Sequence, residues 1–194
     1  FDREIVDRGE TRSSGARAFS TLCRWQVNQA ICRVLSSSSP ESVVRYAKDL
    51  FERERRDYDA VYCVFDRDQH TTFQHALALV RAYNRDIPSR SKDVDGTTRP
   101  RFNAIASEPC FEYWLLLHFK YTDRPYAPAG TNSSCGTVIA DLKVFFADYD
   151  KSCRDTFART FDHLDRAMEN ATRRHARALA DGVMNPSTEV YLLM

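Results

Sequence analysis

The sequence lacks the short motifs that mark several common classes of enzyme. It has only six glycines in 194 residues, and it contains neither GxxxxGK[ST] nor GxGxxG, the loops with which many ATPases and dinucleotide enzymes hold phosphate. The GxSxG turn that presents a nucleophilic serine in many hydrolases is absent too. These absences argue against the usual nucleotide-binding folds, so any use of ATP must come from a partner protein.

Long apolar runs and an excess of one charge are also missing. No apolar stretch approaches the roughly 18 residues that a membrane-spanning helix needs, and no signal peptide is visible. Lys and Arg total 28 against 27 Asp and Glu, for a net charge of +1, so any contact with a polyanion must be local. We expect a cytoplasmic protein with no membrane partner, and the sequence leaves a homo-oligomer open.

Paired cysteine motifs are absent as well. The chain has six cysteines, but none forms a CxxC pair and none clusters with histidine, which argues against a zinc site of the common kinds. Cys32, Cys63 and Cys110 lie inside apolar runs, where a thiol packs like a small hydrophobic side chain. We therefore expect reduced, buried cysteines and no disulfide framework.

What is present is the pattern of an α/β protein. Strands alternate with helices through residues 1–120, which predicts a mainly parallel sheet flanked by helices. Residues 121–194 are predicted to form a helical C-terminal third that packs on this core. We expect strands at 1–6, 30–35, 60–65 and 102–106. Helices are expected at 16–25, from Pro40 with Ser39 as N-cap, and at 71–83, 109–119, 136–149, 153–179 and 190–194, the last capped by residues 185–188.

Two aspartates stand where a buried strand ends. The run Ala60–Phe65 is nearly all apolar, as in a strand covered on both faces, and Asp66-Arg67-Asp68 follows it. Residues two apart on a strand project to the same side, and ligands bind at the carboxyl edge of open parallel sheets. Two neighbouring carboxylates repel each other unless one is protonated or a cation lies between them. The pair therefore favours a Mg²⁺ site; the alternative is that both acids only solubilise a turn.

Other polar residues have simpler explanations. Glu112 stands near the start of an apolar helix, where an acid stabilises the helix dipole, and the alternative is that it points into the site. His118 lies among leucines and is expected to be a hydrogen-bonded core residue. Two groups of basic residues offer local contacts for a phosphate backbone, although solvated charge explains them as well: Arg90, Lys92, Arg99 and Arg101 in a long loop, and Arg173, Arg174 and Arg177 on a late helix.

Three segments together resemble the RloB-like family. They are Val64-Phe65-Asp66-Arg67-Asp68, Ser107-Glu108-Pro109-Cys110-Phe111-Glu112-Tyr113-Trp114-Leu115-Leu116-Leu117-His118-Phe119 and Asn185-Pro186-Ser187-Thr188. Members, including the AbiLii type, are associated with restriction-modification operons and abortive phage resistance, and their genes typically sit beside an ATPase gene. The resemblance implies a Toprim-like nuclease core, in which a glutamate after the first strand and a later DxD jointly hold Mg²⁺.

The sequence departs from the family pattern after its first expected strand. The family usually has a Cys-Glu-Gly-Glu-type run there, whereas this chain has Asp7-Arg8-Gly9-Glu10, with arginine at the usual glutamate position. Glu10 or Asp7 is then the candidate third carboxylate beside Asp66 and Asp68. The leading hypothesis is a Mg²⁺- or Mn²⁺-dependent nuclease-like effector acting on DNA or RNA with a partner ATPase. The alternatives are a catalytically degenerate regulatory subunit and a nucleic-acid-binding module without cleavage.

Overall fold

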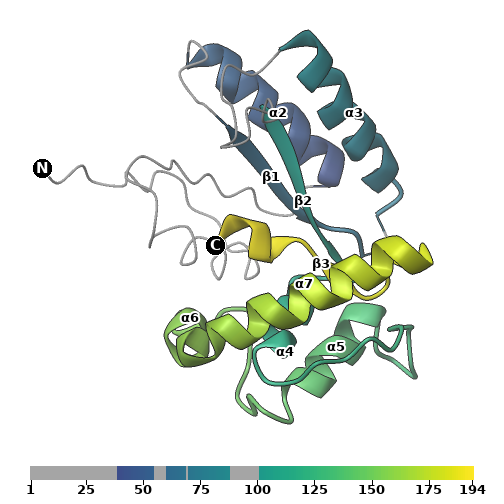
Figure 1. The fold of residues 1–194 in the computed structure, drawn as a ribbon, viewed down its shortest axis with the longest axis vertical. Coiled ribbons are helices and arrows are strands. Elements are labelled where there is room, and N and C mark those ends of the chain that lie inside the picture. Colours follow the sequence, from purple (N-terminus) through teal and green to yellow (C-terminus); the bar gives the residue numbers. More distant parts are fainter. Residues whose placement is uncertain (1–38, 55–59, 69, 88–100) are drawn as a thin grey trace, which may run out of the picture.

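The computed structural model describes residues 39–54, 60–68, 70–87 and 101–194 (Figure 1). The strands expected at 1–6 and 30–35 and the helix expected at 16–25 lie outside these ranges. Within them the protein is α/β, with a sheet of three strands in the order β1-β2-β3. The strands are β1 (Val61–Asp66), β2 (Phe102–Glu108) and β3 (Ser187–Thr188).

The helix α2 (Pro40–Arg53) begins where the sequence predicts. Ser39 is its N-cap, and the Ser39 hydroxyl accepts a hydrogen bond of 3.2 Å from the backbone N–H of Ser42. Proline at the first helical position costs nothing, because the missing N–H would have no partner there. Val44 and Phe51 are buried on the inner face of this helix, which packs against β1 and the next helix, α3 (Phe73–Asp86).

The parallel pair of β1 and β2 is the centre of the sheet. Val61 pairs with Phe102 and Asp66 with Ser107, so both strands end at the same edge. The side chain of Asn84, on α3, holds the start of β2, because it bonds both the N–H and the carbonyl of Phe102 at 2.8 Å. This contact aligns the strand with the helix that precedes it in the described chain.

The third strand makes the sheet mixed and not purely parallel. β3 pairs antiparallel with β2, with Ser107 opposite Thr188, and the hydroxyls of these two residues lie 2.9 Å apart. Ser187 and Thr188 are therefore strand residues, because the polar edge of β2 offers backbone partners. The 3-10 helix η2 (Val190–Leu193) follows Glu189. The expectation that this segment caps the last helix is nevertheless confirmed for Thr188, whose hydroxyl accepts a 3.3 Å hydrogen bond from the N–H of Val190, the first residue of that helix.

The helical C-terminal region is more broken than the periodicity predicts. The expected helix 109–119 is shortened to α4 (Glu112–Leu117). At both ends, backbone N–H groups bond the carbonyl three residues earlier, as Tyr113 does with Cys110 and His118 with Leu115, and these bonds form turns in place of further α-helix. The expected helix 136–149 is α5 (Ser134–Leu142), and 153–179 is divided into α6 (Thr156–Thr160), η1 (Phe161–His163) and α7 (Leu164–Asp181).

Two hydrophobic clusters meet along β2. Phe102 packs with α2, β1 and α3, whereas Ile105 packs with α4, α5 and α7. Figure 1 shows the first group of elements in the upper part of the molecule and the second in the lower part. The carboxyl edge of β1 and β2 therefore faces the junction between the two clusters. Within the described ranges, every helix is too short or too polar to span a bilayer.

Candidate functional site

Asp66 is the last residue of β1 and lies at this junction. Its side chain is half-buried, and its carboxylate accepts a hydrogen bond from the backbone N–H of Phe111. Burial raises the pKa of Asp66 from 3.8 to about 7, and the negative charge of Glu112 adds to the effect, while Lys151 and the Phe111 N–H oppose it. A carboxylate that resists ionisation in this way is a common feature of functional sites.

Asp68 is placed by a turn and not by the strand. The strand ends at Asp66, and Asp68 has a positive φ of 33°, so strand alternation does not decide where its side chain points. Its backbone N–H bonds the carbonyl of Pro109 at 2.9 Å, and its side chain is exposed. The charge of Asp68 still contributes to the raised pKa of Asp66. Between them, Arg67 pairs with Glu108.

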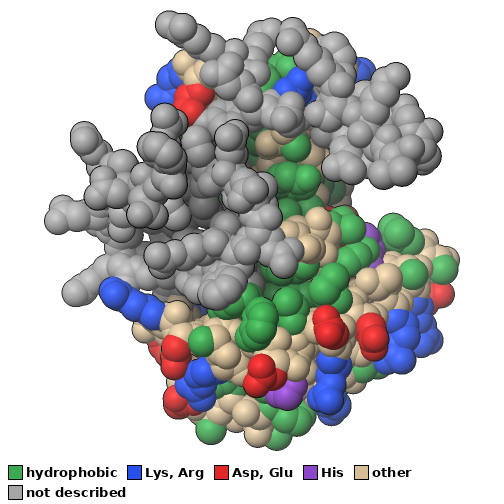
Figure 2. All heavy atoms as spheres, turned by 60° about the vertical axis from the view of Figure 1, so that its left-hand side comes forward, with side chains coloured by type: hydrophobic (Ala, Val, Ile, Leu, Met, Phe, Trp, Pro, Cys, Tyr) green, Lys and Arg blue, Asp and Glu red, His purple; other side chains and the backbone are tan. Residues whose placement is uncertain are grey.

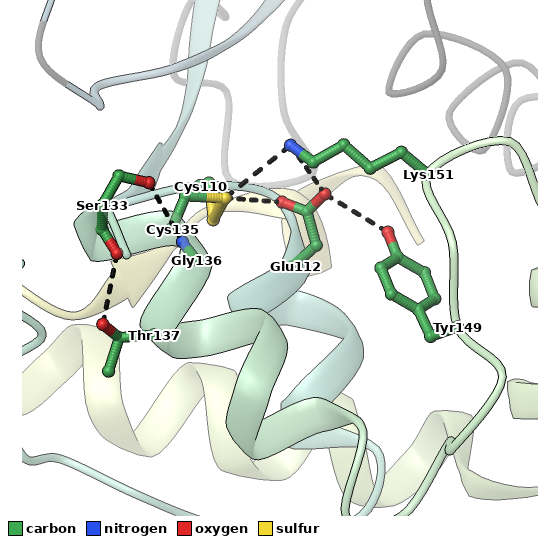
Figure 3. Close-up of a disulfide and its surroundings, with 8 residues drawn as sticks. All are labelled: Cys110, Glu112, Ser133, Cys135, Gly136, Thr137, Tyr149 and Lys151. Carbon is green, nitrogen blue, oxygen red and sulfur yellow. Dashed lines mark hydrogen bonds and ion pairs between the residues drawn. A yellow bond between two sulfur atoms is a disulfide. The ribbon is translucent and has the colours of Figure 1, made fainter. Parts of the chain in front are cut away.

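Glu112 is the most enclosed acid of the site (Figure 3). It is the first residue of α4 and only 2% exposed. The hydroxyl of Tyr149 donates to its Oε1 at 3.2 Å, and the ammonium of Lys151 lies 3.1 Å from the same oxygen. Its other oxygen, Oε2, lies 3.2 Å from the sulfur of Cys135. Glu112 therefore stands in the first turn, as expected, and also points into a built polar pocket beside Asp66.

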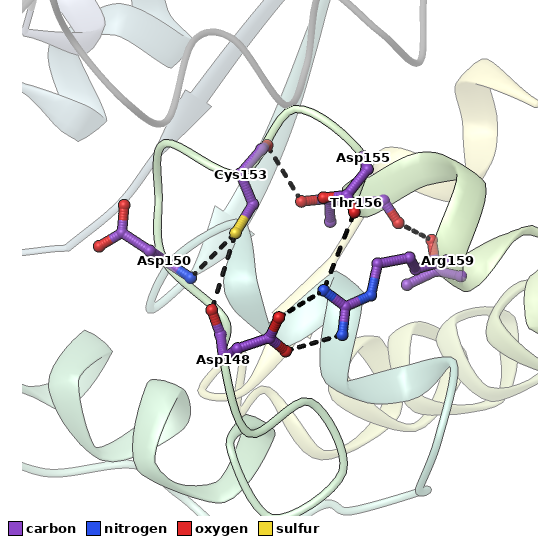
Figure 4. A network of polar contacts seen from close by, with 7 residues as sticks. Asp148, Asp150, Cys153, Asp155, Thr156 and Arg159 are labelled. Carbon is purple, nitrogen blue, oxygen red and sulfur yellow. Dashed lines mark hydrogen bonds and ion pairs between the residues drawn. The ribbon is translucent and has the colours of Figure 1, made fainter.

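The loop after α5 carries Tyr149 and Lys151 to this pocket, and a separate polar network fixes the loop (Figure 4). Both guanidinium nitrogens of Arg159, on α6, donate to the carboxylate of Asp148 at 2.7 and 2.8 Å. The sulfur of Cys153 accepts the N–H of Asp150 at 3.4 Å. Because these contacts flank residues 149 and 151 on both sides, the phenol and the ammonium are held toward Glu112.

A disulfide between Cys110 and Cys135 contradicts the expectation of reduced cysteines. It joins the turn before α4 to the start of α5, with the two Cα atoms 5.7 Å apart. The sequence argument failed because Cys110 and Cys135 are 25 residues apart and share no local motif. Of the described cysteines, Cys63 is buried and free, as expected, and Cys153 is also free.

The chemistry of these side chains fits a hard divalent cation. Asp66, Asp68 and Glu112 supply only oxygen atoms, which Mg²⁺ and Mn²⁺ prefer, but among the described residues these three do not form a group whose ligand atoms all lie within 4.8 Å of one another. Burial is the main cause of the raised pKa of Asp66, and repulsion from the carboxylates of Glu112 and Asp68 adds to it. A bound cation would remove this repulsion. Glu10 and Asp7, the candidates for the third carboxylate, lie outside the described residues.

The remaining sequence candidates have structural contacts of their own. His118 is buried with Nδ1 3.0 Å from the carbonyl of Trp114, and burial lowers its pKa to about 4, which confirms a neutral core histidine. Arg101 is buried and stacks over Phe51, and Arg173 stacks over Tyr121. Arg90, Lys92 and Arg99 lie outside the described residues.

The basic residues of the late helix have contacts of their own as well. Arg174 is buried and donates to the carbonyl of Val183 at 2.7 Å, and Arg177 pairs with Asp123 and Asp181. On the face shown in Figure 2, Lys and Arg side chains lie beside Asp and Glu along the lower part of the molecule. The described charges on that face therefore alternate in sign.

Sequence reasoning missed Tyr149, Lys151 and Cys135 as members of the pocket. All three come from the helical C-terminal region, and no sequence motif marks the segments in which they lie. The one available signal was Glu112 itself, since an acid two positions after a buried cysteine, at the start of an apolar helix, requires polar partners. Those partners could not be named without the fold.

Comparison with known proteins gives one result. The model of the family described as RloB-like protein matches residues 10–194, nearly the whole chain. No match was found among curated proteins or among solved structures. The match includes β1 with its aspartates, the turn and helix that carry Cys110 and Glu112, and the C-terminal strand. This chain belongs to the family of RloB-like proteins.

Proposed function

We propose that this protein is a Mg²⁺- or Mn²⁺-dependent nuclease-like effector subunit of an anti-phage, abortive-infection system, which hydrolyses phosphodiester bonds in DNA or RNA. The observation that carries the proposal is Asp66, half-buried at the carboxyl end of β1 with a pKa raised by burial and by Glu112. Asp66 and Asp68 at the end of β1, with Glu112 close enough to raise the pKa of Asp66, carry oxygen atoms of the kind that a hard cation prefers. Membership of the RloB-like family supports the proposal.

In this proposal Asp66 and Asp68 share one task, and the other acids have tasks of their own. Asp66, held by the Phe111 N–H, and the exposed Asp68 hold the cation, and Glu10 or Asp7 provides a further carboxylate that orients the attacking water. Glu112 adds negative charge beside Asp66. The cation, when bound, supplies Lewis-acid stabilisation of the charge that develops on the phosphate. Asp68 is exposed to solvent, so a nucleic-acid strand can reach the end of β1.

A specific observation favours a second function, that of a catalytically degenerate regulatory or nucleic-acid-binding subunit acting with a partner ATPase. The ammonium of Lys151 lies 3.1 Å from Glu112 and lowers the pKa of Asp66. A fixed cationic side chain can neutralise these acids without a metal ion. Arg8 at the usual glutamate position points in the same direction.

The test compares the purified protein with the variant Asp66→Asn, Asp68→Asn, with and without the neighbouring ATPase. Each protein is incubated with DNA and RNA in Mg²⁺, Mn²⁺ or chelator, and calorimetry measures divalent-cation binding. The nuclease proposal expects cleavage by the native chain that chelation abolishes and that falls at least 100-fold in the double variant, because the metal would lose two ligands.

The matched control is Asp162→Asn, at an exposed aspartate, which is expected to cleave like the native chain. Equal cleavage by the native chain and the double variant would overturn the nuclease proposal. Absence of divalent binding would favour the regulatory subunit. Nucleic acid that is retained in a gel shift under chelation and never cleaved would identify the binding module.

A further inference from the structure

A second group of ligands lies beside the acids of β1. One atom each from Cys110, Glu112 and Cys135 lie within 4.8 Å of one another, and all three residues are buried. Figure 3 shows the disulfide of Cys110 and Cys135 beside the carboxylate of Glu112. Two sulfurs and one carboxylate make a ligand set quite unlike the oxygen-only acids of β1.

We propose that, in the reduced protein, Cys110, Cys135 and Glu112 bind a thiophilic divalent cation, and that Zn²⁺ is the cation they fit best. Thiolate ligands select Zn²⁺ over Mg²⁺. Zinc sites with three protein ligands keep a fourth position for water or another ligand. This proposal does not depend on phosphodiester hydrolysis, although Glu112 is a ligand here and also adds negative charge beside Asp66.

The charges of the pocket balance with such an ion. Two thiolates and one carboxylate carry three negative charges, of which Zn²⁺ neutralises two. Lys151 supplies the third positive charge, since its ammonium lies 3.1 Å from Glu112 and 3.7 Å from the sulfur of Cys135. A buried group of three anions without cations would be costly, so the ion and Lys151 together make the reduced pocket stable.

Neighbouring groups orient the ligands before any ion binds. Tyr149 donates to Oε1 of Glu112, which leaves Oε2 facing Cys135. Cys135 is the second residue of α5, and the N-cap Ser133 accepts the N–H of Gly136 at 3.1 Å. Outer contacts of this kind fix the geometry of metal ligands. Because α4 and α5 pack directly on each other, the pocket is set by the fold as well as by the disulfide.

The disulfide is the oxidised counterpart of the zinc site. With a peroxide as oxidant, the two zinc-bound thiolates lose two electrons and form the S–S bond. The peroxide takes up these electrons and two protons and becomes two water molecules, and Zn²⁺ is released. A dithiol reductant reverses the change by breaking the S–S bond and becoming a disulfide itself, after which the thiols lose their protons on binding Zn²⁺.

The experiment measures zinc and cobalt binding by the full chain after chelator treatment and reduction. Co²⁺ serves as a spectroscopic probe, because thiolate ligands give an intense charge-transfer absorption that oxygen ligands do not. We expect one Zn²⁺ per reduced chain, displacing Co²⁺ and its thiolate band. We expect no such binding after oxidation by hydrogen peroxide, with full recovery after reduction.

Three variants locate the site. Cys110→Ser and Cys135→Ser are expected to lose the thiolate band at Co²⁺ concentrations that saturate the native chain, whereas Cys63→Ala, at a free cysteine in the other hydrophobic cluster, retains it. Lys151→Met is expected to weaken Zn²⁺ binding about 10-fold, because it removes an outer contact of two ligands. Circular dichroism checks that each variant is folded.

The native chain provides its own control, since its oxidised and reduced forms share one sequence. Equal Zn²⁺ binding by both forms would overturn the proposal, as would a reduced chain that binds no stoichiometric Zn²⁺. A folded Cys135→Ser variant that binds Zn²⁺ like the native chain would overturn it too. None of these readouts involves cleavage, so this proposal and the nuclease proposal can fail separately.

Discussion

At the scale of single residues, Asp66 combines two opposing requirements. Its backbone ends strand β1, while its half-buried carboxylate lies close enough to Glu112 to be affected by the negative charge of that residue. Burial and a like charge both disfavour ionisation, and the Phe111 N–H only partly offsets them. The folded protein therefore carries an electrostatic strain at this residue that a bound cation, or a neutral side chain, would relieve.

The stability of the protein should reflect this strain in its pH dependence. The folded pKa of Asp66, about 7, is above its ordinary value of 3.8. The stabilisation from the protonated acid is complete below pH 3.8 and is lost as pH rises through 7. Asp66→Asn should therefore be more stable than the native chain at pH 8 by about 1–3 kcal/mol, after allowance for solvent screening of the half-buried side chain.

Urea unfolding at intervals from pH 4 to 8, in chelator, measures this difference. The gap between variant and native chain should widen with pH and level off above about pH 7. Asp162→Asn, at an exposed site, should follow the native chain throughout. A constant gap across this range would contradict the raised pKa.

Residue by residue, the sequence predicted the acids but not their surroundings. Asp66 and Asp68 were recognisable because a buried strand that ends in two acids is a local pattern. The interpretation of His118 as a core histidine was confirmed for the same reason, since its neighbours in the sequence are apolar. Lys151 and Cys135 approach Glu112 only through the packing of the loop and helix that carry them, and no local pattern encodes that packing.

At the scale of elements, α2 shows how a local signal decides a boundary. Ser39, Pro40 and Glu41 are adjacent in the sequence and act within one turn. Ser39→Ala should lower the free energy of unfolding by about 1 kcal/mol, because the N–H of Ser42 would lose its acceptor. Thermal or urea unfolding measures the loss.

The matched variant Ser39→Asp keeps an acceptor and places a negative charge at the helix N-terminus, so it should be as stable as the native chain. If Ser39→Ala and Ser39→Asp were equally destabilised, the side-chain cap would not be the cause. Because the cap is local, neither variant should alter the pH dependence of stability that we expect from Asp66.

Elements without such local signals were predicted less well. The apolar run 109–119 has helical periodicity, yet only Glu112–Leu117 forms α4, because tight turns close both ends. The long charged run after Cys153 is divided at η1 (Phe161–His163), although its periodicity continues. β3 has only two residues, which is too few to show the alternation of polar and apolar residues that marks a strand. It forms because it pairs with the edge of β2.

At the scale of the whole molecule, the two hydrophobic clusters share one strand. Phe102 belongs to one cluster and Ile105 to the other, so loss of either cluster disturbs the strand that supports both. We predict that Leu116→Ala, in the α4 cluster, lowers the free energy of unfolding by about 2–5 kcal/mol. It should also reduce amide-exchange protection in α2, which lies in the other cluster.

Hydrogen exchange followed by mass spectrometry measures both clusters in one experiment. The control is Leu179→Ala, a leucine that is 67% exposed on α7, where the same substitution should change stability by less than about 0.5 kcal/mol. Exchange that rises only around α4 would mean that the two clusters unfold independently.

The order of the strands in the sheet has a consequence for how the protein is made. Ser187 and Thr188 pair with residues about eighty positions earlier, and Glu189 completes the contact with Ala106. Because synthesis proceeds from the N-terminus, β1, β2 and the helices up to α7 are synthesised before β3. Until synthesis reaches residue 189, the edge of β2 that faces away from β1 lacks its β3 partner, so the three-stranded sheet cannot yet be complete.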